Sequence, residues 1–586
     1  MTDMKITIQH IKETSWEIFT VFAFTIFLKC ILFHYFCYGY VAVSSLWMSP
    51  VDFFAFYVSK LVSAVLIASF VFLFKKQWWT IIMSLLIDVW MIANLVYFRS
   101  YGLFLNVDAL SMAGNLSGFT KSILTYLNWK TLVFLLITIL FSICVFISKS
   151  KEKKYNLFII SLCLAFLFYE LDLLFYTGKV FPTNDSRIVQ VKKIAEGRSS
   201  ASMSHYVESS SIIHYFPIMF IYQKYRTDYL DSYSIGVEFS GDEQKTINSL
   251  FRKEVPKDKA KTNLIVVLVE SLESWALQFK DEKGDYVAPN MKRLIDSDSI
   301  LYCSKIKSQA LYGNSGDGQM IVNSGLLPIQ TGAACMIFGK NKYPNFAHYY
   351  QNATNVNASN NNVWNQYEMN VCYNYSDYVI PKHSKVNDAE IFNMAYESII
   401  TKSGRFCTQI ITISTHVPFE NVANINLPFK KDMPQNMRGY LNCIHYTDSC
   451  IGDFINRLES QSLLSNSTIV VTGDHTVFKK ALLDEFAPFA QKYNYPIPQD
   501  ESYCPFIVYS PAIQGRVMVD ELCYQMDIFP TIMYCIGVDD YYWKGFGVNV
   551  MDSVAMRNRV ISEKDAYRLS DKMIRDNYFY KRQNEK

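Results

Sequence analysis

The amino-acid sequence predicts a protein of two parts: a bundle of five membrane-spanning helices, then an α/β domain with a mostly parallel central sheet. Phe, Leu, Ile, Val and Tyr dominate residues 1–180, whereas the composition beyond about residue 230 is that of a soluble globular domain. From about residue 262, short apolar runs alternate with amphipathic helical patterns, which is typical of a mostly parallel sheet. At 586 residues the chain is also too long for one domain.

Five N-terminal segments are long and apolar enough to cross a bilayer, for which about 20 residues suffice. One such segment alone could be a buried core helix, but five within the first 180 residues favour membrane spans. The segments are Glu17–Tyr40, Val51–Phe74, Trp78–Phe98, Thr131–Ile147 and Tyr155–Tyr176. We therefore expect a transmembrane domain at residues 1–176.

Basic residues in the short loops predict the orientation of this domain. Lys75 and Lys76 lie between the second and third segments, and four lysines at 149–154 lie between the fourth and fifth, whereas the 44–50 loop carries none. The positive-inside rule then places the N-terminus and both lysine loops in the cytoplasm, and everything after about residue 177 outside. Residues 100–128 read as an amphipathic segment on the outer membrane surface, and residues 177–260 as a linker with an interfacial helix.

The outer α/β domain is expected at residues 261–560, followed by a polar tail at 561–586. Its strand candidates are Asn263–Val269, Thr408–Ser414, Ser467–Thr472 and Pro505–Tyr509, and Tyr440–Leu458 has the apolar spacing of a helix. In open α/β sheets, functional groups collect beyond the carboxyl ends of the strands. Glu270, His416 and the pair Asp474–His475 each follow a candidate strand directly.

These residues predict a metal site. Adjacent Asp474 and His475, in VTGDH, offer a carboxylate and an imidazole to one divalent ion, and Glu270 offers a second carboxylate from another strand end. Glu273 in the same VESLES run is the alternative, but Glu270 is nearer the strand end.

Ser315 is the candidate nucleophile. It lies in YGNSGDGQ, where Gly313 and Gly316 permit a tight turn and Gln319–Leu327 reads as helix. A hydroxyl at a helix start faces free backbone N–H groups, which suit a phosphate, and contact with a divalent cation makes its alkoxide available. The alternative is that Ser315 is a helix cap.

Two further residues are candidates for substrate binding. His416 in STHVPF could be a core histidine, but its place after a strand favours substrate binding or proton transfer. Trp364, flanked by Asn residues, is a plausible wall for a polar headgroup. The net charge of +3, without basic–aromatic runs, gives no indication of nucleic acid binding. Four of the 13 cysteines fall in the membrane segments, and no spacing predicts a disulfide framework.

The order of these features resembles the alkaline phosphatase/sulfatase superfamily. The shared motifs are E-S at a strand end, APNMKRL (288–294), the Gly-flanked nucleophile, STHVPF, GDH, MDIFPTI (526–532) and GFGVNVMD (545–552). With five expected membrane helices and an outer C-terminal domain, the chain is most similar to the lipoteichoic acid synthase group, which includes phosphoglycerol and phosphoethanolamine transferases. The implied C-terminal fold is sulfatase-like.

The resemblance implies roles for individual residues. Glu270, Ser315, Asp474 and His475 match the family's ligands to one manganese-type ion, with Mg²⁺ or Zn²⁺ as alternatives. His416, Trp364 and Asn365 match its headgroup-contacting positions. Two departures stand out: the nucleophile is Ser rather than Thr, and Gln366 replaces a phosphate-contacting Arg. GNSGDGQ also lacks the C/S-x-P-x-R pattern of sulfatases.

The function implied is that of a multi-pass enzyme of the bacterial cytoplasmic membrane with an outer catalytic domain. Ser315 would take a phosphoglycerol-type headgroup from a membrane phospholipid and pass it to an envelope glycan or glycolipid. The alternatives are phosphoethanolamine transfer, an outer phosphodiesterase or phosphatase, and an inactive membrane binding or sensor protein. The acceptor, the headgroup, the metal and the oligomeric state do not follow from the sequence.

Overall fold

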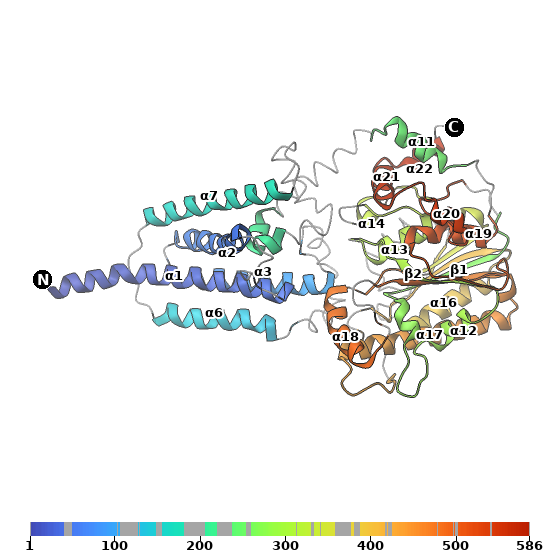
Figure 1. Ribbon diagram of the computed structural model, residues 1–586, viewed down its shortest axis with the longest axis horizontal. Helices are drawn as coiled ribbons and strands as arrows, with labels where there is room; N and C mark the ends of the chain where they lie inside the picture. Colours follow the sequence, from blue (N-terminus) through green and yellow to red (C-terminus); the bar gives the residue numbers. More distant parts are fainter. Residues whose placement is uncertain are drawn as a thin grey trace. The chain divides into compact units, whose positions relative to one another are not determined.

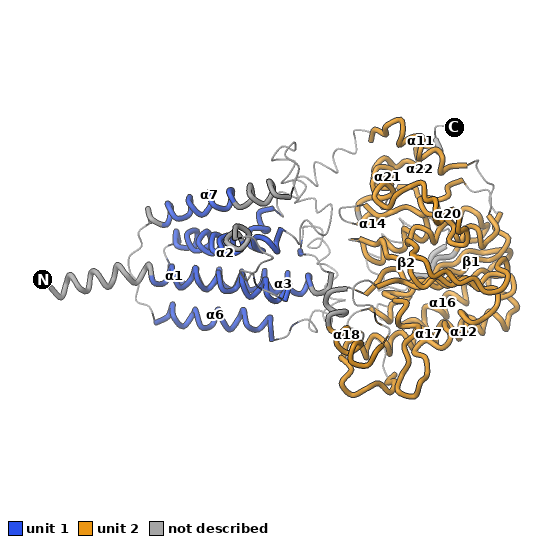
Figure 2. The backbone as a smooth tube through the Cα atoms, in the orientation of Figure 1, with its two compact units in different colours: residues 1–231 blue, residues 232–586 orange. Residues whose placement is uncertain are grey.

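A computed structural model describes most of the chain, in two compact units at residues 1–231 and 232–586. The described stretches are 2–39, 50–74, 76–101, 129–147, 155–180, 206–218, 237–252, 259–311, 313–329, 333–339, 341–357, 377–379, 387–416, 425–477, 479–495, 502–538 and 542–584, with a few isolated positions. Figure 2 colours the two units separately. The cysteines in these stretches form no disulfide bond with one another.

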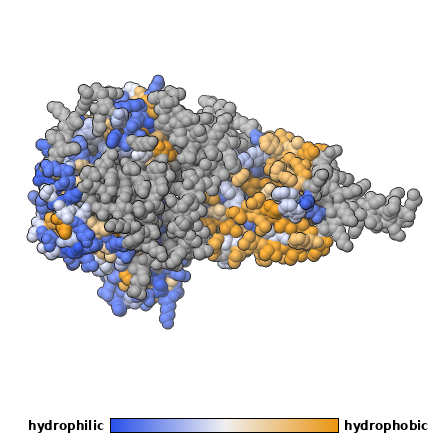
Figure 3. Space-filling model, turned by 180° about the vertical axis from the view of Figure 1, so that it is seen from behind, coloured by the Kyte–Doolittle hydropathy of each residue, from blue (hydrophilic) through white to orange (hydrophobic). Residues whose placement is uncertain are grey.

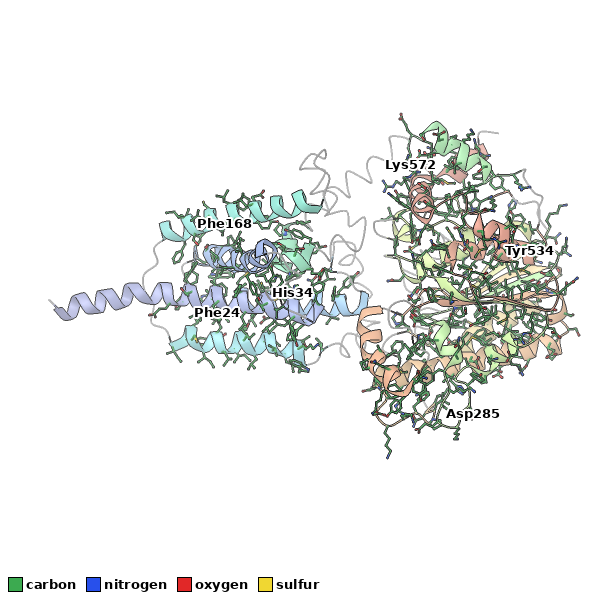
Figure 4. The ribbon with its side chains drawn as sticks, in the orientation of Figure 1. Phe24, His34, Phe168, Asp285, Tyr534 and Lys572 are labelled. Atoms are coloured by element: carbon green, nitrogen blue, oxygen red, sulfur yellow. The ribbon has the colours of Figure 1, made fainter. Side chains whose placement is uncertain are left out.

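The N-terminal unit contains five long helices at the places where apolar segments were expected (Figure 1). They are α1 (Thr2–Tyr38), α2 (Pro50–Val71), α3 (Trp78–Tyr101), α6 (Trp129–Ile147) and α7 (Tyr155–Val180). Many of their outward side chains are apolar, such as Phe24 on α1 and Phe168 on α7, labelled in Figure 4. Figure 3 shows apolar residues gathered over the visible surface of this unit. Such a surface suits a lipid environment.

Three of these helices are long and apolar enough, in their described residues, to cross a membrane. They are the stretches Glu17–Tyr38, Trp78–Phe98 and Trp129–Ile147. The apolar stretches within α2 and α7 are shorter, at Phe56–Val71 and Phe158–Leu171. The predicted bundle of five spans is therefore not confirmed, although five helices are present.

A closed polar network joins three helices inside this unit. The Lys29 ammonium on α1 lies 2.5 Å from a carboxylate oxygen of Asp88 on α3 and donates to Thr138 on α6. Thr138 in turn donates to the other carboxylate oxygen of Asp88 at 2.5 Å. Lys29 and Asp88 are fully buried, so each compensates the charge of the other.

Residues 206–218, expected within the linker, belong to the N-terminal unit. Tyr206, Ile212 and Tyr215 are buried in its apolar core, and Lys60 on α2 donates to the Ser210 carbonyl at 2.7 Å. The unit thus extends beyond the predicted boundary at residue 176. The amphipathic segment expected at 100–128 lies almost wholly outside the described residues.

The C-terminal unit is built on a nine-stranded sheet in the order β4-β3-β5-β1-β6-β7-β2-β8, with β9 also paired to β2. The strands are β1 (Asn263–Val269), β2 (Ile300–Lys307), β3 (Asn352–Asn357), β4 (Asp377–Val379), β5 (Phe406–Ile411), β6 (Ser467–Gly473), β7 (Cys504–Tyr509), β8 (Arg516–Val519) and β9 (Cys523–Tyr524). The sheet is mixed, because β7 runs antiparallel to both β6 and β2. This corrects the expectation of a mostly parallel sheet.

Helices cover both faces of the sheet (Figure 1). Along β1, Leu264, Val266 and Leu268 enter one apolar core, and the alternate residues enter the other. The first face carries α13 (Ser315–Ser324), α14 (Ala334–Ile337), α19 (Ile528–Cys535) and α20 (Ser553–Arg557). The second carries α12 (Pro289–Ile295), α16 (Asp388–Ile400) and α17 (Gln435–Ser460), with α18 at Lys479–Tyr493. Burial on both faces explains the uninterrupted apolar sequence of β1.

The expected polar tail at 561–586 is helical instead. It forms α21 (Glu563–Arg575) and α22 (Tyr578–Asn584), which bury Leu569, Met573 and Phe579 in the core of the first face. Lys572 of α21, labelled in Figure 4, donates to Glu243 of α11 (Gly241–Ser249). Both chain ends of the unit therefore pack on its core, and the predicted boundaries at 260 and 560 each cut through packed structure.

Candidate active site

Three adjacent parallel strands bring the candidate residues to one edge of the sheet. β1 pairs with β5 on one side and with β6 on the other, both in parallel. Val269 pairs with Gly473, so Glu270 and Asp474 occupy corresponding positions just past their strands. His416 follows the end of β5 after a short loop and is half-buried. Because the three strands run parallel, the side chains that follow their ends lie at the same edge of the sheet.

Ser315 reaches this edge from the first residue of α13. Its hydroxyl donates to Glu270 Oε2 at 2.9 Å and lies 3.2 Å from His475 Nε2. His475 Nε2 lies 3.5 Å from Glu270 Oε1 and 3.8 Å from Asp474 Oδ2. All four predicted residues therefore converge on one point.

The chemistry of this cluster fits a divalent metal ion. Glu270, Asp474 and His475 are buried, and one ligand atom of each lies within 4.8 Å of the others. Asp474 Oδ2 is buried and has no hydrogen-bond partner among the described residues, an unsatisfied state that a cation would relieve. The Thr476 carbonyl, 2.9 Å from His475 Nδ1, requires the proton on that nitrogen, which turns the Nε2 lone pair toward the cluster. A mixed oxygen and nitrogen set of this kind suits zinc or manganese.

Close backbone packing holds the two ligand-bearing segments together. A Cβ added to Gly318 of α13 would lie 2.1 Å from the Asp474 carbonyl oxygen, and one added to Gly473 would lie 2.4 Å from the Leu272 carbonyl oxygen. The same Asp474 carbonyl accepts a hydrogen bond from Gln525 at 2.6 Å. Glycine at both positions is what allows α13 and the strand ends to approach this closely.

The turn that presents Ser315 is strained and braced. Asn314 has φ of 45°, a value unfavourable for residues with a side chain. Asp317, two residues after Ser315, accepts the N–H groups of Leu311 and Gly313, each at 2.9 Å. Its carboxylate therefore ties the loop before the nucleophile to the first turn of the helix. Burial raises the pKa of Asp317 to about 7.

The two acidic ligands have opposite pKa shifts. Burial, and then the negative charge of Glu270, raise the pKa of Asp474 to about 7. Burial also acts to raise the pKa of Glu270, but His475, His416 and hydrogen bonds from Ser271 and Ser315 outweigh it and lower the pKa. Burial acts to lower the pKa of His475, but the two carboxylates raise it overall. Such crowding of negative charge in a buried site favours binding of a cation.

The loop that carries His416 is fixed from a neighbouring helix. Asp388, buried at the start of α16, accepts the N–H groups of Ile413 and Ser414 at 2.8 and 3.0 Å. Thr415 donates to the Glu270 carbonyl, which joins this loop to β1. His416 lies close enough to influence the Glu270 carboxylate. Trp364 and Asn365, and also Gln366, lie outside the described residues.

Sequence reasoning missed three supporting residues: Ser271, Asp317 and Gln525. Asp317 carried a signal, because a carboxylate two residues after a nucleophile in a glycine-rich turn can accept the N–H groups of that turn. Gln525 carried none, because its bond to the Asp474 carbonyl joins positions 51 residues apart. Ser271 gave no signal either, since its backbone conformation decides its role.

The fold and the cluster define a class of protein. It is an α/β domain with helices on both faces of its sheet, and a buried Glu-Asp-His set that fits a metal ion lies beside a serine hydroxyl at the start of a helix. The chain matches the sulfatase family over residues 329–538 and the lipoteichoic acid synthase N-terminal domain over residues 2–187. It therefore belongs to the lipoteichoic acid synthase-like proteins of the alkaline phosphatase superfamily, and it is a sulfatase-like transferase.

The similarity to curated relatives extends over nearly the whole chain. Lipoteichoic acid synthase of Staphylococcus saprophyticus is 23% identical over 560 residues, which cover 86% of this chain and 81% of that protein. The Staphylococcus aureus protein of the same name is 21% identical, over 84% of this chain and 79% of its own. Among solved structures, lipoteichoic acid synthase LtaP from Listeria monocytogenes aligns with 58% of this chain and 98% of its own, at 18% identity and a TM-score of 0.48.

Proposed function

We propose that this protein transfers a phosphoglycerol-type headgroup from a membrane phospholipid to an envelope glycan or glycolipid. The observation that carries the proposal is the Ser315 hydroxyl, 2.9 Å from Glu270 and 3.2 Å from His475 at the start of a helix. In this position one hydroxyl adjoins both the metal-fitting cluster and the positive end of a helix dipole. The names of the curated relatives supply the substrate class.

Glu270, Asp474, His475 and Ser315 would hold one divalent ion, of manganese type with Mg²⁺ or Zn²⁺ as alternatives. When bound, such an ion lowers the pKa of a coordinated hydroxyl and offsets phosphoryl charge. The Ser315 hydroxyl would first lose its proton to solvent water. The resulting alkoxide forms a bond to phosphorus as the bond from phosphorus to the diacylglycerol oxygen breaks. The positive end of the α13 dipole stabilises the charge that develops on the phosphoryl oxygens.

His416 is the proposed proton donor and headgroup contact. Its imidazole would protonate the diacylglycerol oxygen as it leaves, and then accept the proton of the acceptor hydroxyl in the second half-reaction. That hydroxyl attacks phosphorus, and the bond to Ser315 breaks to regenerate the serine. Trp364 and Asn365 are proposed to contact the headgroup as well.

The decisive experiment identifies what Ser315 carries. The full chain, loaded with Mn²⁺ and incubated with phosphatidylglycerol or phosphatidylethanolamine, is digested and analysed by mass spectrometry. A phosphoglycerol adduct on Ser315 supports the proposal, and a phosphoethanolamine adduct moves it to the other headgroup. Ser315→Ala should abolish transfer with the fold intact, and Ser315→Thr should retain part of it. Ser249→Ala, an exposed serine at the end of α11, is the matched control.

Two outcomes would contradict the proposal. Unimpaired transfer by Ser315→Ala would make water or another hydroxyl the nucleophile and indicate a simple phosphodiesterase. Unchanged divalent metal content in both Asp474→Ala and His475→Ala, measured by elemental analysis, would remove the metal assignment.

We further propose a multi-pass orientation in the bacterial cytoplasmic membrane. The N-terminus and the lysine loops at 75–76 and 149–154 are cytoplasmic, the five helices span the bilayer, and the catalytic domain is outside. The helices α2 and α7 support this count because they contain apolar stretches flanked by the lysine loops. Cysteine accessibility along the chain tests it, and a cytoplasmic tag at residue 586 would overturn it.

A further inference from the structure

Ser271 adopts an unusual backbone conformation directly beside the metal-fitting cluster. Its φ is 54°, in the left-handed region that favours glycine. The residue follows Glu270 at the end of β1 and is buried. A residue with a side chain in this conformation indicates that the surrounding contacts hold it there.

The conformation lets one residue hold both carboxylates of the cluster. The Ser271 N–H donates to Asp474 Oδ1 at 2.9 Å, and the Ser271 hydroxyl donates to Glu270 Oε1 at 2.8 Å. The opposite oxygens have no bond to Ser271: Glu270 Oε2 accepts the Ser315 hydroxyl, and Asp474 Oδ2 has no hydrogen-bond partner among the described residues. Glu270 Oε1, which accepts the Ser271 hydroxyl, also lies 3.5 Å from His475 Nε2. Each carboxylate thus has one oxygen that Ser271 does not bind.

A third contact fixes Ser271 itself. The hydroxyl of Tyr440 on α17 donates to the Ser271 carbonyl at 2.9 Å and accepts the Glu273 N–H at 3.2 Å. Tyr440 is fully buried between these groups and the aromatic ring of Trp275. Helix α17 therefore holds the backbone in the conformation that directs both Ser271 donors at the carboxylates.

We propose that Ser271 is a positioning residue that presets Glu270 and Asp474 as single-oxygen ligands for one divalent cation. The inference rests on the proposed function, because it takes the cluster as the metal site. Hydrogen bonds from outside the ligand set commonly orient metal ligands, and their loss typically costs about 10- to 100-fold in metal affinity. Without the Ser271 hydroxyl, the Glu270 carboxylate could rotate, and the buried cluster would bind its ion more weakly.

The test measures the dissociation constant of Mn²⁺ by calorimetry on the full chain in detergent. Ser271→Ala removes the hydroxyl but keeps the N–H and the strain. Ser271→Gly removes the hydroxyl and relieves the strain. We expect both variants to weaken Mn²⁺ binding about 10- to 100-fold, with Ser271→Gly unfolding at the higher temperature. Ser462, exposed with φ of 56°, supplies the matched controls Ser462→Ala and Ser462→Gly, which should bind Mn²⁺ like the wild type.

Two further readouts separate positioning from general structural support. At saturating Mn²⁺, Ser271→Ala should recover most of its turnover number, because the ligands themselves are intact, while its half-saturating Mn²⁺ concentration stays raised. Tyr440→Phe, which keeps the ring but loses the bond to the Ser271 carbonyl, should weaken Mn²⁺ binding in the same direction.

The Mn²⁺ affinities of the variants and of the wild type test the inference and the proposed function separately. Mn²⁺ affinity equal to the wild type in folded Ser271→Ala overturns the inference. If Ser271→Ala fails to fold, wild-type affinity in Ser271→Gly overturns it equally. Failure of the wild-type chain to bind any of Mn²⁺, Mg²⁺ or Zn²⁺ instead overturns the proposed function, so the two failures are distinguishable.

Discussion

Gly318→Ala is expected to disrupt the active site although it adds a single methyl group. The new Cβ would lie 2.1 Å from the Asp474 carbonyl oxygen, where ordinary contacts begin at 3.4 Å. This oxygen is held by Gln525 at 2.6 Å, and the Asp474 N–H is held by the Val269 carbonyl at 3.3 Å. Asp474 cannot retreat without breaking these bonds, so the helix start that carries Ser315 must move by about 1 Å.

Two opposing effects determine how far Gly318→Ala lowers the free energy of unfolding. Overpacking of this kind costs about 1–3 kcal/mol of unfolding free energy, and the better helix propensity of Ala returns up to about 1 kcal/mol. Stability should therefore fall modestly. Turnover should fall far more, because a displacement of about 1 Å between reacting groups can cost about 100-fold in rate. A large loss of activity with a small loss of stability is the expected pattern.

The assay compares turnover, Mn²⁺ affinity and thermal unfolding in Gly318→Ala and in Gly241→Ala. Gly241, at the start of α11, has open space where its Cβ would lie, so the same substitution there should leave turnover and metal binding unchanged. Wild-type turnover in Gly318→Ala would refute the claim that close packing of α13 on the strand end sets the distance from Ser315 to its partners.

Three other substitutions test separate parts of the structure. Asp317→Asn weakens the charge-assisted bonds to the loop before the nucleophile, so turnover should fall while Mn²⁺ affinity, by calorimetry, stays near the wild type. Burial acts to raise the pKa of Glu243, but the hydrogen bond and charge of Lys572 outweigh it and lower the pKa below 4.5. Glu243 therefore adds stability above pH 4.5 that is lost on acidification, so Glu243→Gln should unfold at a lower temperature than the wild type at pH 7, and the difference should shrink as the pH falls below 4.5. Lys29→Met leaves Asp88 buried and unpaired, which should cost about 3–5 kcal/mol of stability in detergent, and the double variant Lys29→Met/Asp88→Leu should recover most of it.

The convergence of the site could be predicted from sequence because strand ends carry their own signal. A buried strand is an uninterrupted apolar run, and the polar residue that ends it lies at the edge of the sheet. Glu270 and Asp474 were placed correctly at this edge by that rule alone. The rule does not cover Ser315: the glycine-rich turn made it a candidate nucleophile, and its place beside Glu270 and His475 comes from the structure. These predictions need only local sequence and the general geometry of α/β sheets.

The direction of β7 could not be predicted in this way. Cys504–Tyr509 is buried along nearly its whole length, and a fully buried strand has the same apolar pattern whichever way it runs. Its direction depends on the path of the chain between β6 and β7, which includes α18. Likewise, β8 and β9 are short, and each pairs with β2, more than 200 residues away. Strand pairing between residues so far apart in the chain gives no recognisable pattern in the local sequence.

The C-terminal segment was misjudged for a different reason, because its average composition hid its periodicity. Charged residues make 561–586 polar overall, yet Ala566, Leu569, Met573 and Ile574 recur at the spacing of one helical face, and all four are buried. Ser562 caps the helix by accepting the N–H of Asp565. A test of spacing and capping, rather than of mean polarity, would have predicted a packed helix here. The consequence is functional as well as structural: Tyr567 of this helix donates to the Gln309 carbonyl, and Gln309 exchanges hydrogen bonds with the Gln525 segment that holds Asp474. Deleting the segment should therefore weaken the support of the metal site.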